Sequence, residues 1–113
     1  MKPPLLAPLV FALSLLAACA RTPAPGPLEA GVGAARRGLW EEAVRHWALA
    51  LEREPGSAAA FNTLAVAHER RGAWDDARRA YEEALRLDPG NRTIRDNYEA
   101  FLERLAAVRG RRP

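Results

Sequence analysis

The chain has 113 residues, of which 17 are basic and 14 are acidic, so its formal net charge is +3. Apolar residues make up 49% and charged residues 27%, a composition typical of a folded protein. This length allows one small domain and excludes a multidomain enzyme. The single cysteine excludes an internal disulfide framework and any metal site built from several cysteines.

The N-terminal segment has the pattern of a signal peptide. One basic residue, Lys2, precedes the apolar run from Leu5 to Ala18, and this run has 14 residues. Because about 20 apolar residues are needed to span a bilayer, a transmembrane helix is the weaker interpretation. A basic start, a short apolar core and small residues at its end predict a secretory signal peptide over residues 1–18.

The apolar run ends with Leu16-Ala17-Ala18-Cys19, which resembles the lipobox of bacterial lipoproteins. The resemblance implies a diacylglycerol thioether on Cys19, which would anchor the protein to a membrane. The alternative is a free thiol in an ordinary signal peptide. Because Ala20 rather than Asp follows the cysteine, the resemblance also implies a bacterial cell envelope location, in the outer membrane facing the periplasm.

Residues 20–27 read ARTPAPGP, with three prolines and one glycine. Such a composition favours an extended polyproline-like chain. Residues 19–27 are therefore predicted to be the lipidated cysteine and a tether, with plain disorder as an alternative that would serve equally as a spacer.

A repeat of 34 residues organises the rest of the chain. Aligning Pro55 with Pro89 pairs glycines, tryptophans and alanines across the period, and eight of the 20 positions from Gly38 to Ser57 are identical. Self-similarity at a fixed period indicates a repeat architecture.

Start and stop signals divide this region into five helices, expected at about 28–37, 40–54, 58–71, 73–87 and 92–108. Ser57 and Asn91 are expected N-caps, and Gly38 and Gly72 follow pairs of arginines at helix ends. The sequence thus predicts an all-α domain over residues 28–108 and a basic tail over residues 109–113.

The second repeat unit resembles a tetratricopeptide repeat, whose signature is W-x2-L-G-x2-Y…A-x3-F…P. Here the unit reads Phe61-x2-Leu64-Ala65-x2-His68…Ala77-x3-Tyr81…Pro89. The first unit is degenerate in its first helix, where Pro27 replaces the aromatic residue and Ala30-Gly31 replaces Leu-Gly, and the last helix resembles a cap. The resemblance implies antiparallel helix pairs stacked as a short solenoid, with structural roles for Gly38, Trp40, Ala43, Trp47, Ala50, Pro55, Phe61, Leu64, Ala65, Gly72, Trp74, Ala77, Tyr81, Ala84 and Pro89.

The same resemblance implies a concave groove that takes a peptide or a partner helix. Carried over by position, the groove residues are Leu28, Val32, Ala35, Arg36, Asn62, Val66, Glu69, Arg70 and Asp96. Arg36 and Arg70 are equivalent across the period, so they are either a ladder for an acidic ligand or, the favoured interpretation, helix-end charges stabilised by the dipole. The carboxylate-clamp pattern of the family is not reproduced.

No catalytic or metal site is predicted. The hydroxyl side chains and the two histidines form no nucleophile–base set that spacing reveals, and no metal-binding or phosphate-binding motif is present. His68 is expected to be a packed histidine and His46 a helix-surface residue. No cofactor is expected beyond the lipid on Cys19.

Charge spacing argues against nucleic-acid binding. Arginines stand at helical spacing from acids, for example Arg86 from Glu82 and Arg95 from Glu99, which predicts solvated helix faces. The basic tail is expected to be a soluble terminus, although contact with anionic headgroups or peptidoglycan is the alternative.

The sequence therefore predicts a membrane-tethered adaptor that docks another envelope protein, in secretion, pilus or envelope assembly. Because two repeats and a cap are close to the lower limit for a stable array, the alternative is a structural envelope lipoprotein that self-associates and takes no transient peptide. A hydrolase of envelope polymers is the least favoured hypothesis.

Overall fold

The structure, a computed structural model, describes residues 22–111. This part of the chain contains five α-helices and no strand: α1 (Pro27–Arg36), α2 (Trp40–Arg53), α3 (Ala58–Arg70), α4 (Trp74–Leu87) and α5 (Arg92–Gly110). The all-α prediction is confirmed, and every helix end lies within two residues of its expected position. Helix α5 runs two residues past 108, so the first two residues of the predicted tail are helical.

The helix ends follow the local chemistry of the sequence. The Ser57 hydroxyl accepts a hydrogen bond of 3.1 Å from the Ala60 amide at the start of α3, and the Asn91 side chain does the same for Ile94 in α5. Gly38 and Gly72 adopt φ values of 76° and 74° after α1 and α3, in the left-handed region that favours glycine. These residues allow the sharp reversals that make successive helices antiparallel.

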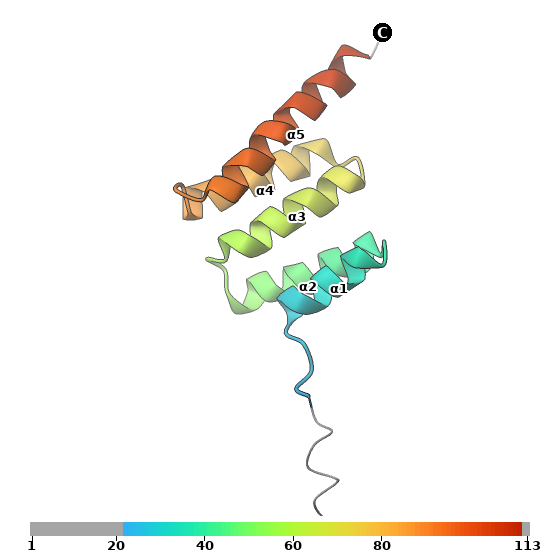
Figure 1. Ribbon diagram of the computed structural model, residues 1–113, viewed down its shortest axis with the longest axis vertical. Coiled ribbons are helices and arrows are strands. Elements are labelled where there is room, and N and C mark those ends of the chain that lie inside the picture. The colour runs from blue at the N-terminus through green and yellow to red at the C-terminus, as the bar shows by residue number, and fades with distance from the viewer. Residues whose placement is uncertain (1–21, 112–113) are drawn as a thin grey trace, which may run out of the picture.

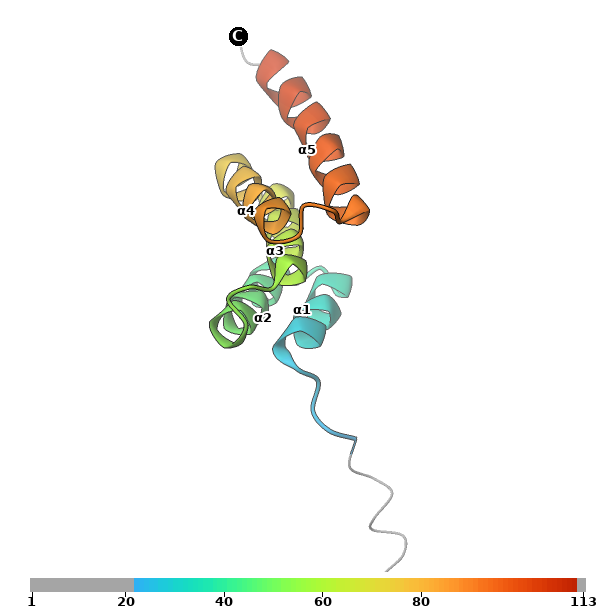
Figure 2. The same cartoon turned by 90° about the vertical axis from the view of Figure 1, so that its left-hand side faces the viewer.

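The helices form a stack in which α1 and α2 pair at one end and α5 lies at the other (Figure 1). Turned by 90°, α1 and α5 lie on the same side of the stack, and α3 lies between them (Figure 2). The first helices of the successive units therefore share one face of the stack, while α2 and α4 form the opposite side.

Two clusters of buried side chains hold the stack together. The first joins α1, α2 and α3 and contains Ala34, Ala43, Trp47, Leu64 and Ala67. The second joins α3, α4 and α5, and it contains Ala65, Ala77, Ala80, Tyr81, Phe101 and Leu105. Alanines with no exposed surface allow close helix crossings, while the large aromatic side chains fill the space between them.

Two expected ion pairs are wrong in detail. Arg86 pairs with Glu83, whereas Glu82 accepts a hydrogen bond of 3.0 Å from the Tyr98 hydroxyl of α5. Arg95 donates to the carbonyl oxygen of Pro89 at 2.9 Å rather than pairing with Glu99. Glu82 is within reach of an aromatic hydroxyl on the neighbouring helix, a partner that spacing along one helix does not reveal.

The predicted signal peptide, Cys19 and the last two residues of the basic tail lie outside the described residues. Among the helices within residues 22–111, none is long and apolar enough to cross a membrane.

Candidate functional site

An apolar groove lies between α1 and the neighbouring helices on the face shared by α1, α3 and α5. It has a volume of about 300 Å³. The apolar groove is lined by Val32, Ala35, Arg36, Trp40, Trp47, Thr63 and Val66. Trp40 and Val66 are only half-buried, so an incoming apolar side chain can contact both of them.

A polar groove follows on the same face, between α3 and α5, with a volume of about 510 Å³. It is lined by Val66, Glu69, Arg70, Trp74, Tyr81, Asn97 and Arg104. Because Val66 lines both grooves, the two form one continuous surface that runs from α1 past α3 to α5.

Glu69 is the centre of the polar groove. Its side chain is only 12% exposed, and it accepts two hydrogen bonds from the guanidinium of Arg104, with Nη2 3.1 Å from Oε2. The Tyr81 hydroxyl also donates to Oε2, at 3.4 Å. The bond to Glu69 raises the pKa of Arg104, and burial together with the Glu69 charge raises the pKa of Tyr81 to about 12. The negative charge of Glu69 is therefore already matched within the chain.

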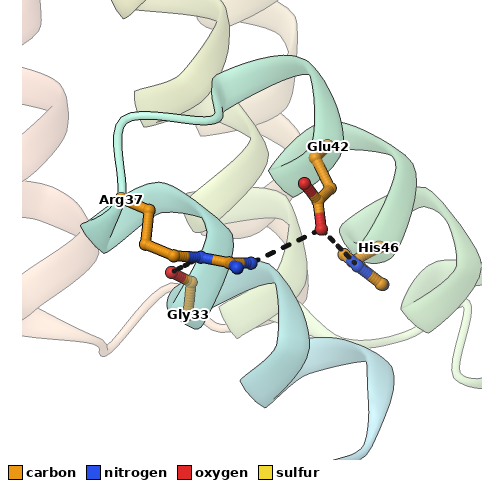
Figure 3. Close-up of polar contacts among 4 residues, drawn as sticks. All are labelled: Gly33, Arg37, Glu42 and His46. Atoms are coloured by element: carbon orange, nitrogen blue, oxygen red, sulfur yellow. Dashed lines mark hydrogen bonds and ion pairs between the residues drawn. The ribbon is translucent and has the colours of Figure 1, made fainter.

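The two neighbouring arginines at the end of α1 have different surroundings. Arg37 donates from Nε to the Gly33 carbonyl at 3.3 Å and from Nη2 to Glu42 at 3.5 Å, and the same Glu42 oxygen lies 3.6 Å from Nε2 of His46 (Figure 3). Arg36, next to it, lines the apolar groove instead.

The equivalent arginines at the end of α3, Arg70 and Arg71, also differ from each other: one pairs with a carboxylate and the other does not. Nη2 of Arg71 lies 3.9 Å from Glu41 of α2, while the guanidinium carbon of Arg70 lies 5.6 Å from the centre of the Trp40 ring. Neither Arg36 nor Arg70 has an ion pair within residues 22–111. The Arg70 guanidinium thus lies over Trp40 and Arg36 lines the same groove as Trp40, and neither arginine has a carboxylate partner in this part of the chain.

The remaining predicted groove residues take other positions. Leu28 packs into the first core cluster, and its carbonyl accepts a hydrogen bond from Trp47. The Asn62 side chain accepts a hydrogen bond of 3.2 Å from Asn97 of α5. Asp96 is exposed and lies 4.0 Å from Arg92, while its neighbour Asn97 lines the groove.

Sequence reasoning missed Arg104, Asn97, Thr63 and the lining role of four aromatic residues. For Arg104 a signal exists, since Arg36, Arg70 and Arg104 stand 34 residues apart. That period also relates Thr63 to Asn97. The last helix lacks the repeat signature, which favours its interpretation as a cap, although its residues continue the groove.

Most of the predicted structural residues are buried at helix crossings. Ala43, Ala65, Ala77 and Ala84 have no exposed surface, Tyr81 is 1% exposed and Trp47 is 3% exposed. The prolines of the signature, Pro55 and Pro89, are exposed in the turns that follow α2 and α4. His68 is half-buried, and burial lowers its pKa from 6.5.

Known proteins share this arrangement of helices. A family model described as the tetratricopeptide repeat matches residues 58–91, the segment that contains α3 and α4. Among solved structures, the C-terminal TPR-containing domain of an FK506-binding protein of Plasmodium falciparum superposes with a TM-score of 0.68 at 24% identity. The fold is that of a tetratricopeptide repeat domain.

A second solved tetratricopeptide repeat (TPR) domain is also similar. The second TPR domain of the human RPAP3 protein, solved in complex with the HSP70 peptide SGPTIEEVD, has a TM-score of 0.63 at 21% identity. The alignments cover 75% and 66% of this chain but only 56% and 62% of the Plasmodium and human domains. No curated protein matches the sequence. The solved structures establish the fold, and the helix-lined grooves are its candidate binding surfaces.

Proposed function

We propose that this TPR protein is a lipid-anchored adaptor of the bacterial cell envelope that binds a peptide segment of another envelope protein in its groove. The observation that carries the binding role is Trp40, which is half-buried in the apolar groove, has the Arg70 guanidinium over its ring and shares the groove with Arg36. An adaptor of this kind would serve the assembly of secretion, pilus or envelope machinery.

The groove favours a peptide that combines an apolar side chain with a carboxylate. An apolar side chain would contact Trp40 and Val66, where it displaces water from apolar surface. A carboxylate beside it would be attracted by Arg36 and Arg70, and a guanidinium can bind a carboxylate through two parallel hydrogen bonds. Glu69 would not repel this ligand strongly, because Arg104 already neutralises its charge.

The human TPR domain supports a peptide ligand in general terms. It is bound to SGPTIEEVD, a short peptide that carries both apolar and acidic residues. This chain shares the fold of that domain but does not reproduce the carboxylate-clamp pattern, so we propose a peptide of related chemistry and not the same peptide.

The anchor is proposed from the sequence. Residues 22–26, the described end of the predicted tether, are exposed and form no helix. An extended segment of this kind would separate the repeats from a lipid on Cys19 and leave the groove accessible. At about 3.1 Å per residue, a polyproline-like tether would hold the domain on the order of 25 Å from the bilayer.

The binding role is tested with a phage-displayed library of random linear peptides selected on the full chain. Selected peptides should contain an apolar residue close to Asp or Glu. In fluorescence anisotropy, Arg36→Ala and Arg70→Ala should each weaken binding by about five- to tenfold, as expected for loss of a charged hydrogen bond. The matched control is Arg37→Ala, since Arg37 is adjacent but paired with Glu42. Equal losses in all three variants, or selection of basic peptides, would contradict the proposal.

The anchor is tested by intact mass spectrometry of the chain expressed in a bacterium that processes lipoproteins. The expected product begins at Cys19 and carries the mass of a diacylglycerol thioether, while Cys19→Ala carries no lipid. An unmodified thiol at residue 19 in the wild-type chain, or retention of residues 1–18, overturns the anchor but not the groove.

A further inference from the structure

The outer surface of α5 carries a regular stripe of exposed side chains. Arg95, Glu99, Leu102, Ala106 and Arg109 follow one another at spacings of four, three, four and three residues, and all five are exposed. This is the heptad spacing by which one helix packs along another. The core-facing side of α5 is different, since it buries Ile94, Phe101 and Leu105.

An open groove of about 460 Å³ lies along this stripe. Arg78 and Glu82 of α4 line one wall, and Tyr98, Leu102, Ala106 and Arg109 of α5 line the other. Leu102 is 40% exposed, and it is one of three large apolar side chains of the described chain that are exposed. The C-terminal half of α5 extends beyond the other helices, so another helix can approach it (Figure 1).

We propose that a second copy of the chain docks on this stripe, with the two α5 helices antiparallel. In one antiparallel register, Glu99 of each copy lies opposite Arg109 of the other, and Leu102 lies opposite Ala106. A twofold axis generates each pair twice, as a closed and self-complementary interface requires. Two apolar layers are then flanked by two layers of opposite charge.

The other registers of the same stripe are electrostatically worse. A parallel pairing places each residue opposite its own copy, so Arg95, Glu99 and Arg109 would each face a like charge. An antiparallel register shifted by one stripe position places Arg95 opposite Arg109 and Glu99 opposite Ala106, so two like charges face each other. A shift of two positions places Arg95 opposite Ala106 and Glu99 opposite Leu102, which leaves both charges against apolar side chains. The charges on the stripe therefore favour a second copy of the chain as the docking partner, with its α5 helix antiparallel to the first.

The contact is compatible with what surrounds it. Arg109 lies 3.8 Å from Asp75 of its own chain, but both side chains are more than half exposed, so this ion pair is weak and can exchange for Glu99 of the second copy. The groove residues of α5, Asn97 and Arg104, are not on the stripe. Dimerisation therefore leaves the peptide groove free, and because a single helix pair buries little area, a transient dimer is expected.

Charge reversal tests the proposal in the full chain, with native mass spectrometry after release from detergent micelles. Wild type should dimerise, and Glu99→Arg and Arg109→Glu should each weaken dimerisation by about tenfold or more, because each reversal turns two attractive pairs into two repulsive ones. An equimolar mixture of the two variants should form a heterodimer. One variant then carries arginine at both positions and the other carries glutamate at both, so each of the two pairs again joins opposite charges.

Asp96→Arg is the matched control, because Asp96 is exposed on α5 but lies outside the stripe. It should dimerise like wild type. A monomeric wild-type chain, or single variants that dimerise as well as wild type, overturns the inference. A folding defect cannot imitate the expected result, because the two variants must recover association when mixed. Peptide binding is measured separately, so failure here does not bear on the groove.

Discussion

Nε1 of Trp47 donates a hydrogen bond of 3.1 Å to the carbonyl oxygen of Leu28, and this contact joins α2 to the first turn of α1. Trp47 is 3% exposed, so its indole N–H needs a partner inside the protein. The approach is possible because Gly31 has no side chain between the indole and the α1 backbone. The degenerate first helix of the repeat array is therefore held by a large aromatic residue of α2.

Replacement of Gly31 by Ala is expected to destabilise the fold. A Cβ at this position would lie 2.2 Å from Nε1 of Trp47, so either α1 or the indole must move. The loss should be about 1–3 kcal/mol in the free energy of unfolding, as is typical of overpacking. Chemical denaturation followed by Trp fluorescence measures it.

Gly33→Ala is the control on the same helix. No atom lies within 4 Å of a Cβ at residue 33, and its φ is not positive. Alanine there should stabilise the fold by about 0.5–1 kcal/mol, because glycine is a poor helix former. If both variants lost stability equally, close packing on Trp47 would not be the cause of the loss in Gly31→Ala.

The secondary structure and repeat organisation were predictable because their causes are local. Cap residues such as Ser57, the Arg-Arg-Gly helix ends and small residues at 34-residue spacing each act within a few residues of the chain. The positions buried at helix crossings followed from the repeat signature, because one stacking geometry recurs in each unit.

The composition of the groove was only partly predictable. Arg36, Arg70 and Arg104 occupy equivalent positions of the repeat. Only Arg104 forms hydrogen bonds with Glu69, which lies 35 residues away in the sequence. Which guanidinium is free and which is paired depends on how α5 crosses α3, and no spacing along one helix contains that information. The lining roles of Trp40 and Tyr81 were hidden because both were assigned to the core.

Removal of the Arg104 guanidinium should destabilise the α3–α5 contact. Arg104→Ala leaves the largely buried Glu69 carboxylate without its cationic partner. We expect a loss of about 1–2 kcal/mol in the free energy of unfolding, and a smaller loss when Glu69→Gln removes the charge as well. A double-mutant cycle measured by urea unfolding gives the coupling, and a coupling near zero would contradict the paired arrangement.

Alkaline pH should weaken the fold through Tyr81. Burial and the neighbouring Glu69 raise its pKa from 10.0 to about 12, so the folded state holds the phenol proton more tightly than the unfolded state does. Its contribution is fully present below pH 10 and is lost as the pH rises from about 10 to 12. The loss should be on the order of 1–2 kcal/mol, measured by urea unfolding across this range.

Tyr81→Phe is the control for this pH dependence. The variant keeps the aromatic packing against Phe101 and Tyr98 but has no ionisable group at position 81. Stability should then fall less steeply between pH 10 and 12, with a residual slope from Tyr98, whose pKa is also raised by burial. An unchanged slope in Tyr81→Phe would show that Tyr81 does not control the alkaline loss.

The two N-caps should contribute equally and independently. Ser57 and Asn91 are equivalent across the repeat, and each accepts one amide hydrogen bond of 3.1 Å. Ser57→Ala and Asn91→Ala should each cost about 1 kcal/mol, whereas Ser57→Asp should retain the cap. Because the caps begin different helices and share no partner, the double alanine variant should lose the sum, within about 0.5 kcal/mol. Thermal and urea unfolding measure all four variants, and a loss well above the sum would mean that α3 and α5 unfold in a coupled way.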